Sequence, residues 1–489
     1  MERKTVIVVG SGPAGLAAAE ALLDQGRGAV QVQVMTLGHH LGGKAASWRD
    51  AGERVVEHGQ HVVLGFYREL RGLLRRCGIR PDDTLVSSGG EYLYWEDRDD
   101  SAHRLYVGDF LPKLMDRWVR YDGFTHQEKA ALTGFVIDMV LGLGPPVSED
   151  LDDVCFSAWA LSRGLPPSVA ATNIFRANRE VQLNWPGEIS AYAMLNTLRA
   201  ATRDPGRHLT AYPAGGMSEL WWEPIAARIE DLGGSLVRRQ KLVRVDATGT
   251  DLQGVVFARP QFHGVGGRWT GSVPTVAGTE QRHQPDAVIL AIPPPCVQEA
   301  LPAHALGLPG LRGIPRLTTV APLGLHVWHR NRSRGAPGVI VGGLAPPLPY
   351  VMDNANGYHA LAHDPNAGAA LHFVGQLACF EEYSDVELLD RALAAVRRVP
   401  GYEMMDREGV LDWTVLRHTA PHARYWNAEP GSVRHKPSPR TPIRGLYLAG
   451  DWVRSELDFP CMETAVRSGR QAAGLALDDL FRNERRVSA

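Results

Sequence analysis

The sequence has few cysteines, almost no net charge and no long uninterrupted apolar run. Its five cysteines are widely separated and never spaced as CxxC, which argues against a disulfide framework and against a zinc site. Lys and Arg number 52 and Asp and Glu 54, so the formal net charge of −2 gives no general attraction for nucleic acid. No stretch reaches the roughly 18 consecutive apolar residues of a membrane-spanning helix. The composition therefore predicts an ordinary globular protein without a nucleic-acid partner or a metal site.

A glycine-rich motif stands near the start of the chain. The β-branched run Thr5–Val9 is followed by GSGPAG and then by an alanine- and leucine-rich stretch, which predicts a strand, a tight turn and a helix. In dinucleotide-binding folds the three glycines of such a turn allow the bend, the approach of a pyrophosphate and close helix–strand packing. A second predicted strand at 30–37 favours the same reading. The residues assigned to this turn are Gly10, Gly12, Pro13, Ala14 and Gly15.

Position 36 departs from this pattern. Dinucleotide folds usually end the second strand with an acid about 20 residues after the last glycine, where it binds the ribose hydroxyls. Thr36 stands there, 21 residues after Gly15. Its hydroxyl can hydrogen-bond a ribose but lacks the charge-assisted strength of a carboxylate. We therefore expect either weaker cofactor affinity or a ribose held by backbone and water.

Two short motifs follow the second predicted strand. LGGKAASW supplies adjacent glycines, which let the extended pyrophosphate and ribityl chain of a flavin pass close to the backbone. EHGQHVVLGFY places an acid and two imidazoles around one glycine. A plain surface turn formed by Gly59 is the alternative for this second motif. The residues assigned to cofactor binding here are Gly42, Gly43, Lys44, Gly59, Gln60 and His61.

On these segments the chain resembles the FAD-dependent amine oxidases and, more closely, the carotenoid (phytoene-type) desaturases and related squalene-pathway oxidoreductases. The resemblance implies that the EHGQH segment runs beneath the flavin ring with His61 closest to it. Glu57 would bond the backbone or Lys44, and His58 would face away from the ring.

The far end of the chain carries a second set of motifs. GLYLAGD predicts a strand ending at an acid, and PCMETAVRSG opens a final helix. The family resemblance implies that both segments hold the ribityl chain and the pyrimidine side of the ring, where a helix N-terminus stabilises the reduced flavin anion. It also implies an adenine-contacting strand at 236–245. The residues concerned are Val243, Gly450, Asp451, Met462, Glu463 and Ala465.

The resemblance implies an α/β fold in which a discontinuous, Rossmann-like FAD-binding domain is interleaved with an α+β substrate domain. We assign 1–90, 206–299 and 431–489 to the first, and 91–205 and 300–430 to the second.

Two stretches outside the motifs also give predictions. The glycine-rich stretch 258–285 predicts a long hairpin or loop. The apolar stretch 131–143 predicts a helix, either buried in the core or exposed as a tunnel wall or membrane-docking surface.

With FAD bound, the expected reaction is hydride transfer from a substrate C–H bond to flavin N5. We expect an apolar substrate, polyene or terpenoid in character, with His61 as acid/base or positioning group. The alternative is amine oxidation, for which the resemblance implies a lysine on a substrate-domain strand; the candidate strand at 316–330 has none. A non-redox escort protein of the same fold is a third alternative.

The electron acceptor and the location of the protein follow from what the sequence lacks. A second GxGxxG and a redox-active CxxxxC are absent, so we expect dioxygen or a quinone as electron acceptor. The first residues show no secretory signal, so we expect the cytoplasm, with peripheral membrane contact as an open alternative.

Overall fold

The computed structural model describes residues 3–59, 61–87, 91–106, 120–141, 147–176, 189–203, 210–262, 271–333, 340–342, 350–354 and 366–482. Gln60, assigned above to the cofactor site, lies outside this set. Among the helices described, none combines the length and the hydropathy needed to cross a bilayer.

A parallel sheet joins the beginning, the middle and the end of the chain. Counted over the described residues it has five strands, in the order β10-β2-β1-β14-β22. Buried valines and isoleucines fill β1 and β14, as expected for strands that are covered on both faces. The strands are β1 (Lys4–Val9), β2 (Val30–Thr36), β10 (Ser235–Arg238), β14 (Ala287–Leu290) and β22 (Leu446–Leu448).

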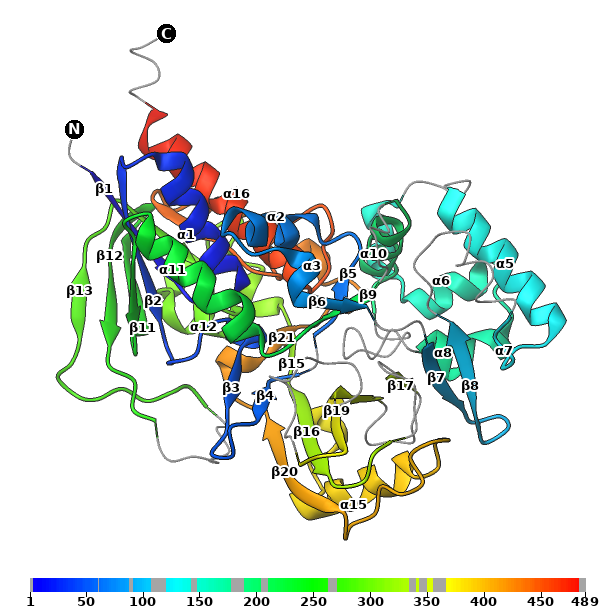
Figure 1. The fold of residues 1–489 in the computed structure, drawn as a ribbon. Helices are drawn as coiled ribbons and strands as arrows, with labels where there is room; N and C mark the ends of the chain where they lie inside the picture. Colours follow the sequence, from blue (N-terminus) through cyan, green and yellow to red (C-terminus); the bar gives the residue numbers. More distant parts are fainter. Residues whose placement is uncertain are drawn as a thin grey trace.

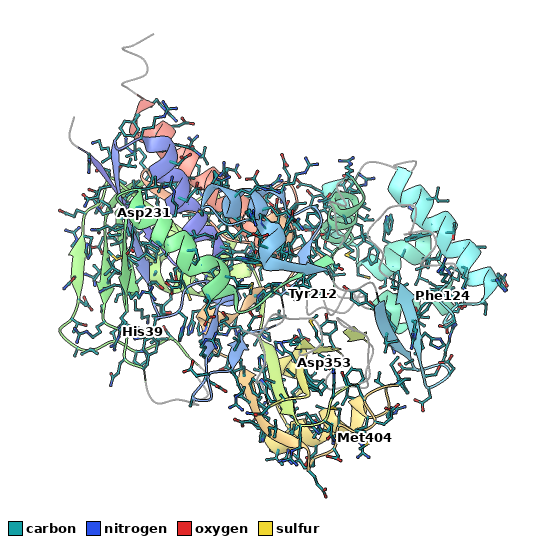
Figure 2. The ribbon with its side chains drawn as sticks, viewed as in Figure 1. His39, Phe124, Tyr212, Asp231, Asp353 and Met404 are labelled. Atoms are coloured by element: carbon teal, nitrogen blue, oxygen red, sulfur yellow. The ribbon has the colours of Figure 1, made fainter. Side chains whose placement is uncertain are left out.

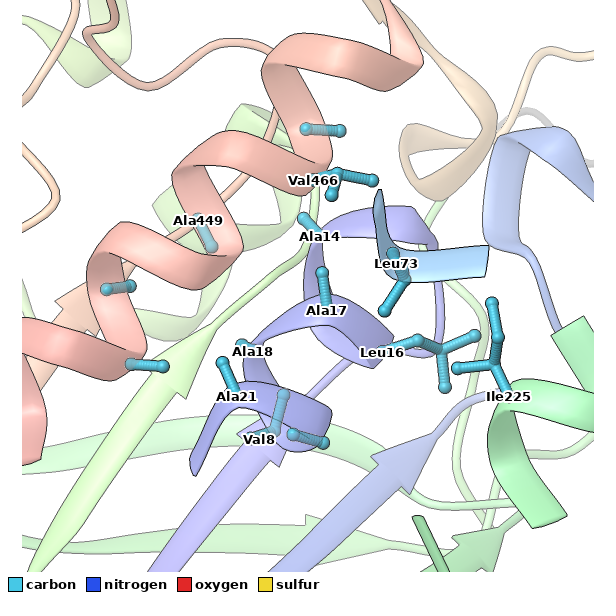
Figure 3. Packing of buried hydrophobic residues seen from close by; sticks show 14 of the residues in the cluster. Val8, Ala14, Leu16, Ala17, Ala18, Ala21, Leu73, Ile225, Ala449 and Val466 are labelled. Carbon is cyan, nitrogen blue, oxygen red and sulfur yellow. The ribbon is translucent and has the colours of Figure 1, made fainter. Parts of the chain in front are cut away.

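Helices α1 and α16 pack on this sheet with small residues at their contact. The backbone carbonyl of Ala14 lies so near Gly469 that a Cβ there would meet it at 2.1 Å. Figure 3 shows Val466 of α16 beside Ala14, with Leu16 and Ile225 meeting on another side of α1. This close packing fixes the two helix N-termini relative to each other. The helices around this layer are α1 (Pro13–Gly26), α2 (Arg68–Arg76), α3 (Pro81–Thr84), α11 (Glu223–Asp231), α12 (Pro294–Ala300), α13 (Ala303–Leu306) and α16 (Met462–Leu480).

A second, mostly antiparallel sheet lies below the first in Figure 1, with helix α15 packed on it. Over the described residues it has seven strands in the order β20-β16-β19-β18-β17-β7-β8, and β17 pairs with β7 in parallel. Its elements are β7 (Glu91–Glu96), β8 (Ser101–Tyr106), β16 (Pro322–His329), β17 (Ile340–Gly342), β18 (Tyr350–Asp353), β19 (Ala369–Gln376), β20 (Val410–Arg417) and α15 (Asp385–Val396).

A lobe of helices, cyan to green in Figure 1, continues from β7 and β8. Its members are α5 (His126–Leu141), α6 (Phe156–Ser162), α7 (Pro167–Ala170), α8 (Asn173–Arg176) and α10 (Ala191–Arg203). Small sheets connect the layers: β3 (Ser47–Arg49) with β4 (Val55–Glu57), β5 (Val63–Leu64) with β9 (Thr210–Pro213) and β6 (Leu85–Ser87), and β15 (Thr319–Val320) with β21 (Tyr425–Trp426). A further sheet holds β11 (Lys241–Thr248), β12 (Asp251–Ala258) and β13 (Gln281–His283).

The predicted α/β fold is confirmed, with one correction to a strand. The stretch 236–245 forms two strands in different sheets, because the chain turns at Arg239, whose φ is 59°. The stretch 258–285, predicted as a long hairpin or loop, connects β12 to β13, and these two strands pair in antiparallel register. Helix α5 covers most of the predicted helix at 131–143. The parallel sheet draws its strands only from the three segments assigned to the FAD-binding domain, while the domain boundaries stay a prediction.

Candidate active site

A cavity of about 830 Å³ extends from the carboxyl ends of β1 and β2 into the space next to the second sheet. Ligands of open α/β sheets bind at these strand ends, where helices on the two sides of the sheet diverge. The described residues that line it include most of those assigned from the sequence: Gly10, Gly12, Pro13, Ala14, Thr36, Gly43, Lys44, Gly59, His61, Gly450, Asp451, Met462 and Ala465. The cavity thus brings both ends of the chain to one site.

Of the assigned residues that the structure describes, four do not line the cavity, and two of these are glycines with packing roles. A Cβ on Gly15 would lie 1.9 Å from the carbonyl oxygen of Gly10, so this glycine allows close strand–helix packing, as predicted. Gly42 has a φ of 109°, and a Cβ there would meet the Trp222 ring at 2.3 Å. Both glycines therefore shape the loops that surround the cavity.

The assignments of Val243 and Glu463 are corrected by the structure. Leu242 lines the cavity in place of Val243. The pairing of β11 with β12 shifts register between Leu242 and Arg244, so Val243 lies at an irregularity of the strand. The carboxylate of Glu463 is fully buried and accepts hydrogen bonds from the backbone N–H groups of Glu69 and Leu70, at 2.9 and 3.0 Å. It therefore caps the N-terminus of α2 and does not face the cavity.

The glycine turn at the N-terminus of α1 leaves room for a phosphate. A Cβ on Gly12 would find protein atoms only at 3.8 Å or beyond, and Gly12 faces the cavity, so the missing side chain leaves open space there. No side chain caps the helix at Gly12. The first-turn N–H groups can therefore bind an anion, and the turn fits the pyrophosphate of a dinucleotide.

The ribose position next to this turn is polar but uncharged. The hydroxyls of Ser11 and Thr36 lie 2.7 Å apart, and both side chains are buried and line the cavity. One hydroxyl donates to the other, which leaves one proton and further lone pairs for a ligand. Thr36 therefore stands where a ribose acid is usual, without supplying a charge.

A partly buried ion pair forms part of the cavity wall. Lys44 Nζ donates to Asp451 Oδ2 at 2.8 Å and lies 4.6 Å from the centre of the Tyr425 ring. Burial, together with the charge of Asp451, raises the pKa of the Tyr425 hydroxyl well above its usual value. The suggested bond between Lys44 and Glu57 does not form. Glu57 accepts a hydrogen bond from the Met217 backbone N–H at 3.4 Å instead, which agrees with the alternative prediction that it bonds the backbone.

Histidines gather beside the segment EHGQH. His58 and His61 both line the cavity, and the expectation that His58 faces away from the flavin ring stays a prediction. His58 Nδ1 lies 3.2 Å from Nδ1 of His418, a residue at the end of β20 that the sequence did not point to. His61 Nδ1 lies 3.9 Å from Glu57 Oε2 and makes no hydrogen bond within the described chain.

The hydrogen bonds fix which nitrogens of the His58–His418 pair carry protons. His418 Nε2 lies 2.9 Å from the carbonyl oxygen of His58, which can only accept, so His418 Nε2 carries the proton. Burial lowers the pKa of His418 to about 4, so its Nδ1 is an acceptor at neutral pH. His58 Nδ1–H must then donate, which leaves His58 Nε2 as an unprotonated base.

The far end of the cavity is apolar and aromatic. It is closed by residues from β7, the helical lobe and the second sheet, none of which carried a motif. Figure 2 shows Tyr212 between these parts, and its hydroxyl lies 2.7 Å from that of Tyr92. Two sequence signals bear on this end: Tyr92 and Tyr94 stand two positions apart, as on one face of a strand, and the apolar stretch 131–143, one of whose predicted roles is a tunnel wall, supplies Leu132 and Phe135. The lining residues include Tyr92, Tyr94, Leu132, Phe135, Phe156, Phe175, Met194, Leu198, Tyr350 and Val374.

The chain is similar to known flavoproteins along almost its whole length. The model of the family "Flavin containing amine oxidoreductase" matches residues 13–477. The 15-cis-phytoene desaturase of Narcissus pseudonarcissus is 24% identical over 99% of this chain and 81% of that protein. The corresponding enzyme of Synechococcus elongatus is 22% identical over 96% of this chain and 94% of its own.

Solved structures share the fold. Putrescine oxidase matches with a TM-score of 0.69 and 19% identity over 97% of this chain and 99% of that one. Cyclohexylamine oxidase from Brevibacterium oxydans matches with a TM-score of 0.67 and 16% identity over 98% of this chain and 99% of that one. The phosphate-compatible glycine turn and the family match agree on the cofactor, which is FAD. The chain therefore belongs to the flavin-containing amine oxidoreductase family and is an FAD-dependent oxidoreductase.

Proposed function

We propose that this protein oxidises an apolar, polyene- or terpenoid-like substrate by a desaturase-type reaction. The observation that carries the proposal is the charge distribution along the cavity. Of the described lining residues, those with a full charge form two pairs, Lys44 with Asp451 at 2.8 Å and Lys241 with Glu299 at 3.1 Å. Among the residues that the structure describes, the aromatic end has neither a carboxylate nor a cation, so an uncharged substrate fits this lining without desolvating an unpaired charge.

The second support comes from strand β16. A family resemblance to amine oxidases implies a lysine on this strand, yet Pro322–His329 reads PLGLHVWH. A protonated amine would also find no carboxylate for its N–H donors among the described residues of the aromatic end. The phytoene desaturases among the relatives have substrates of the proposed class by name, at 22 to 24% identity.

Desaturation removes a hydride from one carbon and a proton from its neighbour, and the electron pair of the second C–H bond becomes the new C=C bond. FAD, when bound, accepts the hydride. The aromatic end holds the chain of the substrate and excludes water. His61 is the residue to which we assign the proton, because its ring lines the cavity and its Nδ1 faces the Glu57 carboxylate at 3.9 Å. Protonated His61 gains this carboxylate as a counter-charge.

For reoxidation we propose dioxygen or a quinone, since the sequence contains no second dinucleotide motif. We also propose a cytoplasmic protein that meets its apolar substrate free or at a membrane surface.

The test is anaerobic mixing of the full-length, FAD-loaded protein with carotenoid precursors, other terpenoids and primary amines, while the oxidised-flavin absorbance is recorded. Bleaching by an apolar substrate alone is the expected result, and bleaching by amines alone would contradict the proposal.

A His61→Ala variant sharpens the test. It should retain FAD and show flavin reduction or product formation slowed by about 100-fold, in the range of general acid–base catalysis. His40→Ala, which changes a histidine elsewhere along the same cavity, is the matched control and should react at the wild-type rate. An unchanged rate in His61→Ala would remove His61 from the mechanism.

A further inference from the structure

A second polar cluster lines the cavity on the side of the glycine turn. Lys241 Nζ donates to Glu299 Oε1 at 3.1 Å and to Ser272 Oγ at 2.7 Å, and the Ser272 hydroxyl donates to the same Glu299 oxygen at 2.7 Å. All three residues line the cavity. They come from β11, from the 258–285 hairpin and from α12, which are far apart in the sequence. None was assigned from a motif.

The connection to Thr36 places this cluster beside the ribose position. Strand β10 ends with Arg238 paired to Thr36, and the Gln240 N–H donates to the Thr36 carbonyl at 2.9 Å. Lys241 is the next residue, and Gln240, Lys241 and Leu242 all line the cavity beside Thr36. In this fold the ribose of the adenosine half lies at the end of the second strand. The cluster therefore faces the adenosine half of the dinucleotide.

The Glu299 carboxylate is held through one of its oxygens, which leaves the other free to accept a hydrogen bond from a ligand. Its Oε1 takes both the Lys241 and the Ser272 bonds, whereas Oε2 accepts no hydrogen bond from the described part of the chain. The side chain of Glu299 is 42% exposed and that of Lys241 17%, so the carboxylate stands at the cavity mouth with its lysine beneath it. A carboxylate held in this way accepts hydroxyl or amino protons of a nucleoside through a charge-assisted hydrogen bond.

We propose that Glu299, oriented by Lys241 and Ser272, is the carboxylate that binds the adenosine half of FAD in this chain. Other dinucleotide folds place a carboxylate at the end of the second strand, where this chain has Thr36. Glu299 supplies the carboxylate from α12 instead. Its hydrogen-bond donors are the ribose hydroxyls or the adenine amino group.

The experiment is equilibrium dialysis of full-length protein against graded FAD and, separately, FMN, which lacks the adenosine half. Glu299→Ala should weaken FAD binding at least about tenfold, the loss expected for a charge-assisted hydrogen bond. It should leave FMN binding and the melting temperature unchanged. A change within twofold for FAD, or an equal loss for FAD and FMN, would overturn the proposal.

Two control variants separate this role from a structural one. Glu280→Ala breaks a more exposed pair with Arg244 of β11, at 3.1 Å and away from the cavity, and should bind FAD as wild type does. Ser272→Ala removes the link to the hairpin but keeps the Glu299 carboxylate. Its loss of FAD affinity should therefore be clearly smaller than that of Glu299→Ala. An equal loss would show that Glu299 only fastens the hairpin, and would overturn the proposal.

Discussion

The two ends of the cavity are built by different means. At the dinucleotide end, glycines and helix N-termini present the backbone, and the local sequence determines the shape. At the aromatic end, side chains from β7, the helical lobe and β18 and β19 meet from distant parts of the chain. The dinucleotide end, which is the cofactor half of the cavity, therefore depends on positions without side chains. The aromatic end, which is the substrate half, depends on which side chains are present. Each half should therefore fail in its own way when it is mutated.

The largest effect is expected at the glycine turn. Gly12→Val fills the space that we assign to the pyrophosphate, while its Cβ meets no protein atom closer than 3.8 Å. We expect a folded, colourless protein that retains far-ultraviolet circular dichroism and binds FAD more than 1,000-fold more weakly, about 4 kcal/mol. Gly15→Ala is the contrast, because its Cβ would lie 1.9 Å from the Gly10 carbonyl oxygen and should destabilise the fold itself. Stoichiometric FAD in purified Gly12→Val would refute the pyrophosphate assignment.

This contrast also shows how much of the molecule could be predicted from its sequence. The glycine spacing predicted the turn at Gly10 to Gly15 because only the backbone is involved, and backbone requirements are local. His418 was not predicted, because its role depends on a hydrogen bond to His58, 360 positions away. The prediction of Val243 was wrong by one residue, because the sequence does not show the register shift of β11 between Leu242 and Arg244.

A buried ion pair beneath the cavity should give the next largest effect. Lys436 and Asp458 are both fully buried, 2.9 Å apart, and Lys436 lies 4.1 Å from the Trp426 ring. Burial lowers the pKa of Lys436, although Asp458 opposes this. Lys436→Met removes the nearer counter-charge of Asp458 and leaves it, among the described residues, only Arg454, at 3.7 Å. It should lower the free energy of unfolding by about 3 kcal/mol in denaturant titrations, the lower end of the range for a broken buried pair.

The double variant Lys436→Met/Asp458→Leu is the control for this pair. It removes both charges and should recover most of the lost stability. Equal losses in the single and double variants would show that packing around these residues, and not the loss of the counter-charge, sets the cost.

The buried histidines of the substrate half should make the protein sensitive to acid. Burial lowers the pKa of both His326 and His418 to about 4, from about 6.5 in the unfolded chain. Between these values the unfolded chain binds more protons, so stability rises with pH: it is fully present above about pH 6.5 and is lost as the pH falls towards 4. Each group contributes roughly 3 kcal/mol to the loss. In His418→Gln the free energy of unfolding should depend less steeply on pH, by the uptake of about one proton, as measured by unfolding at pH 7.5, 5.5 and 4.5. An unchanged slope would show that His418 does not take up a proton on unfolding.

The smallest effect is expected at Cys461, where the two halves meet. Its thiol lines the cavity just before α16, a position that invites a covalent bond to flavin. Burial, however, raises the pKa of this thiol to about 11, so almost none of it is thiolate at pH 7. The thiol also lies 3.4 Å from the Thr464 hydroxyl, within hydrogen-bonding distance for sulfur. We therefore expect acid precipitation to release all of the FAD from wild type, and Cys461→Ser to bind FAD within about twofold of wild type. Flavin that stays with the precipitated wild-type chain but not with Cys461→Ser would show a covalent link, and the cofactor half would then depend on a reactive side chain as well as on its backbone.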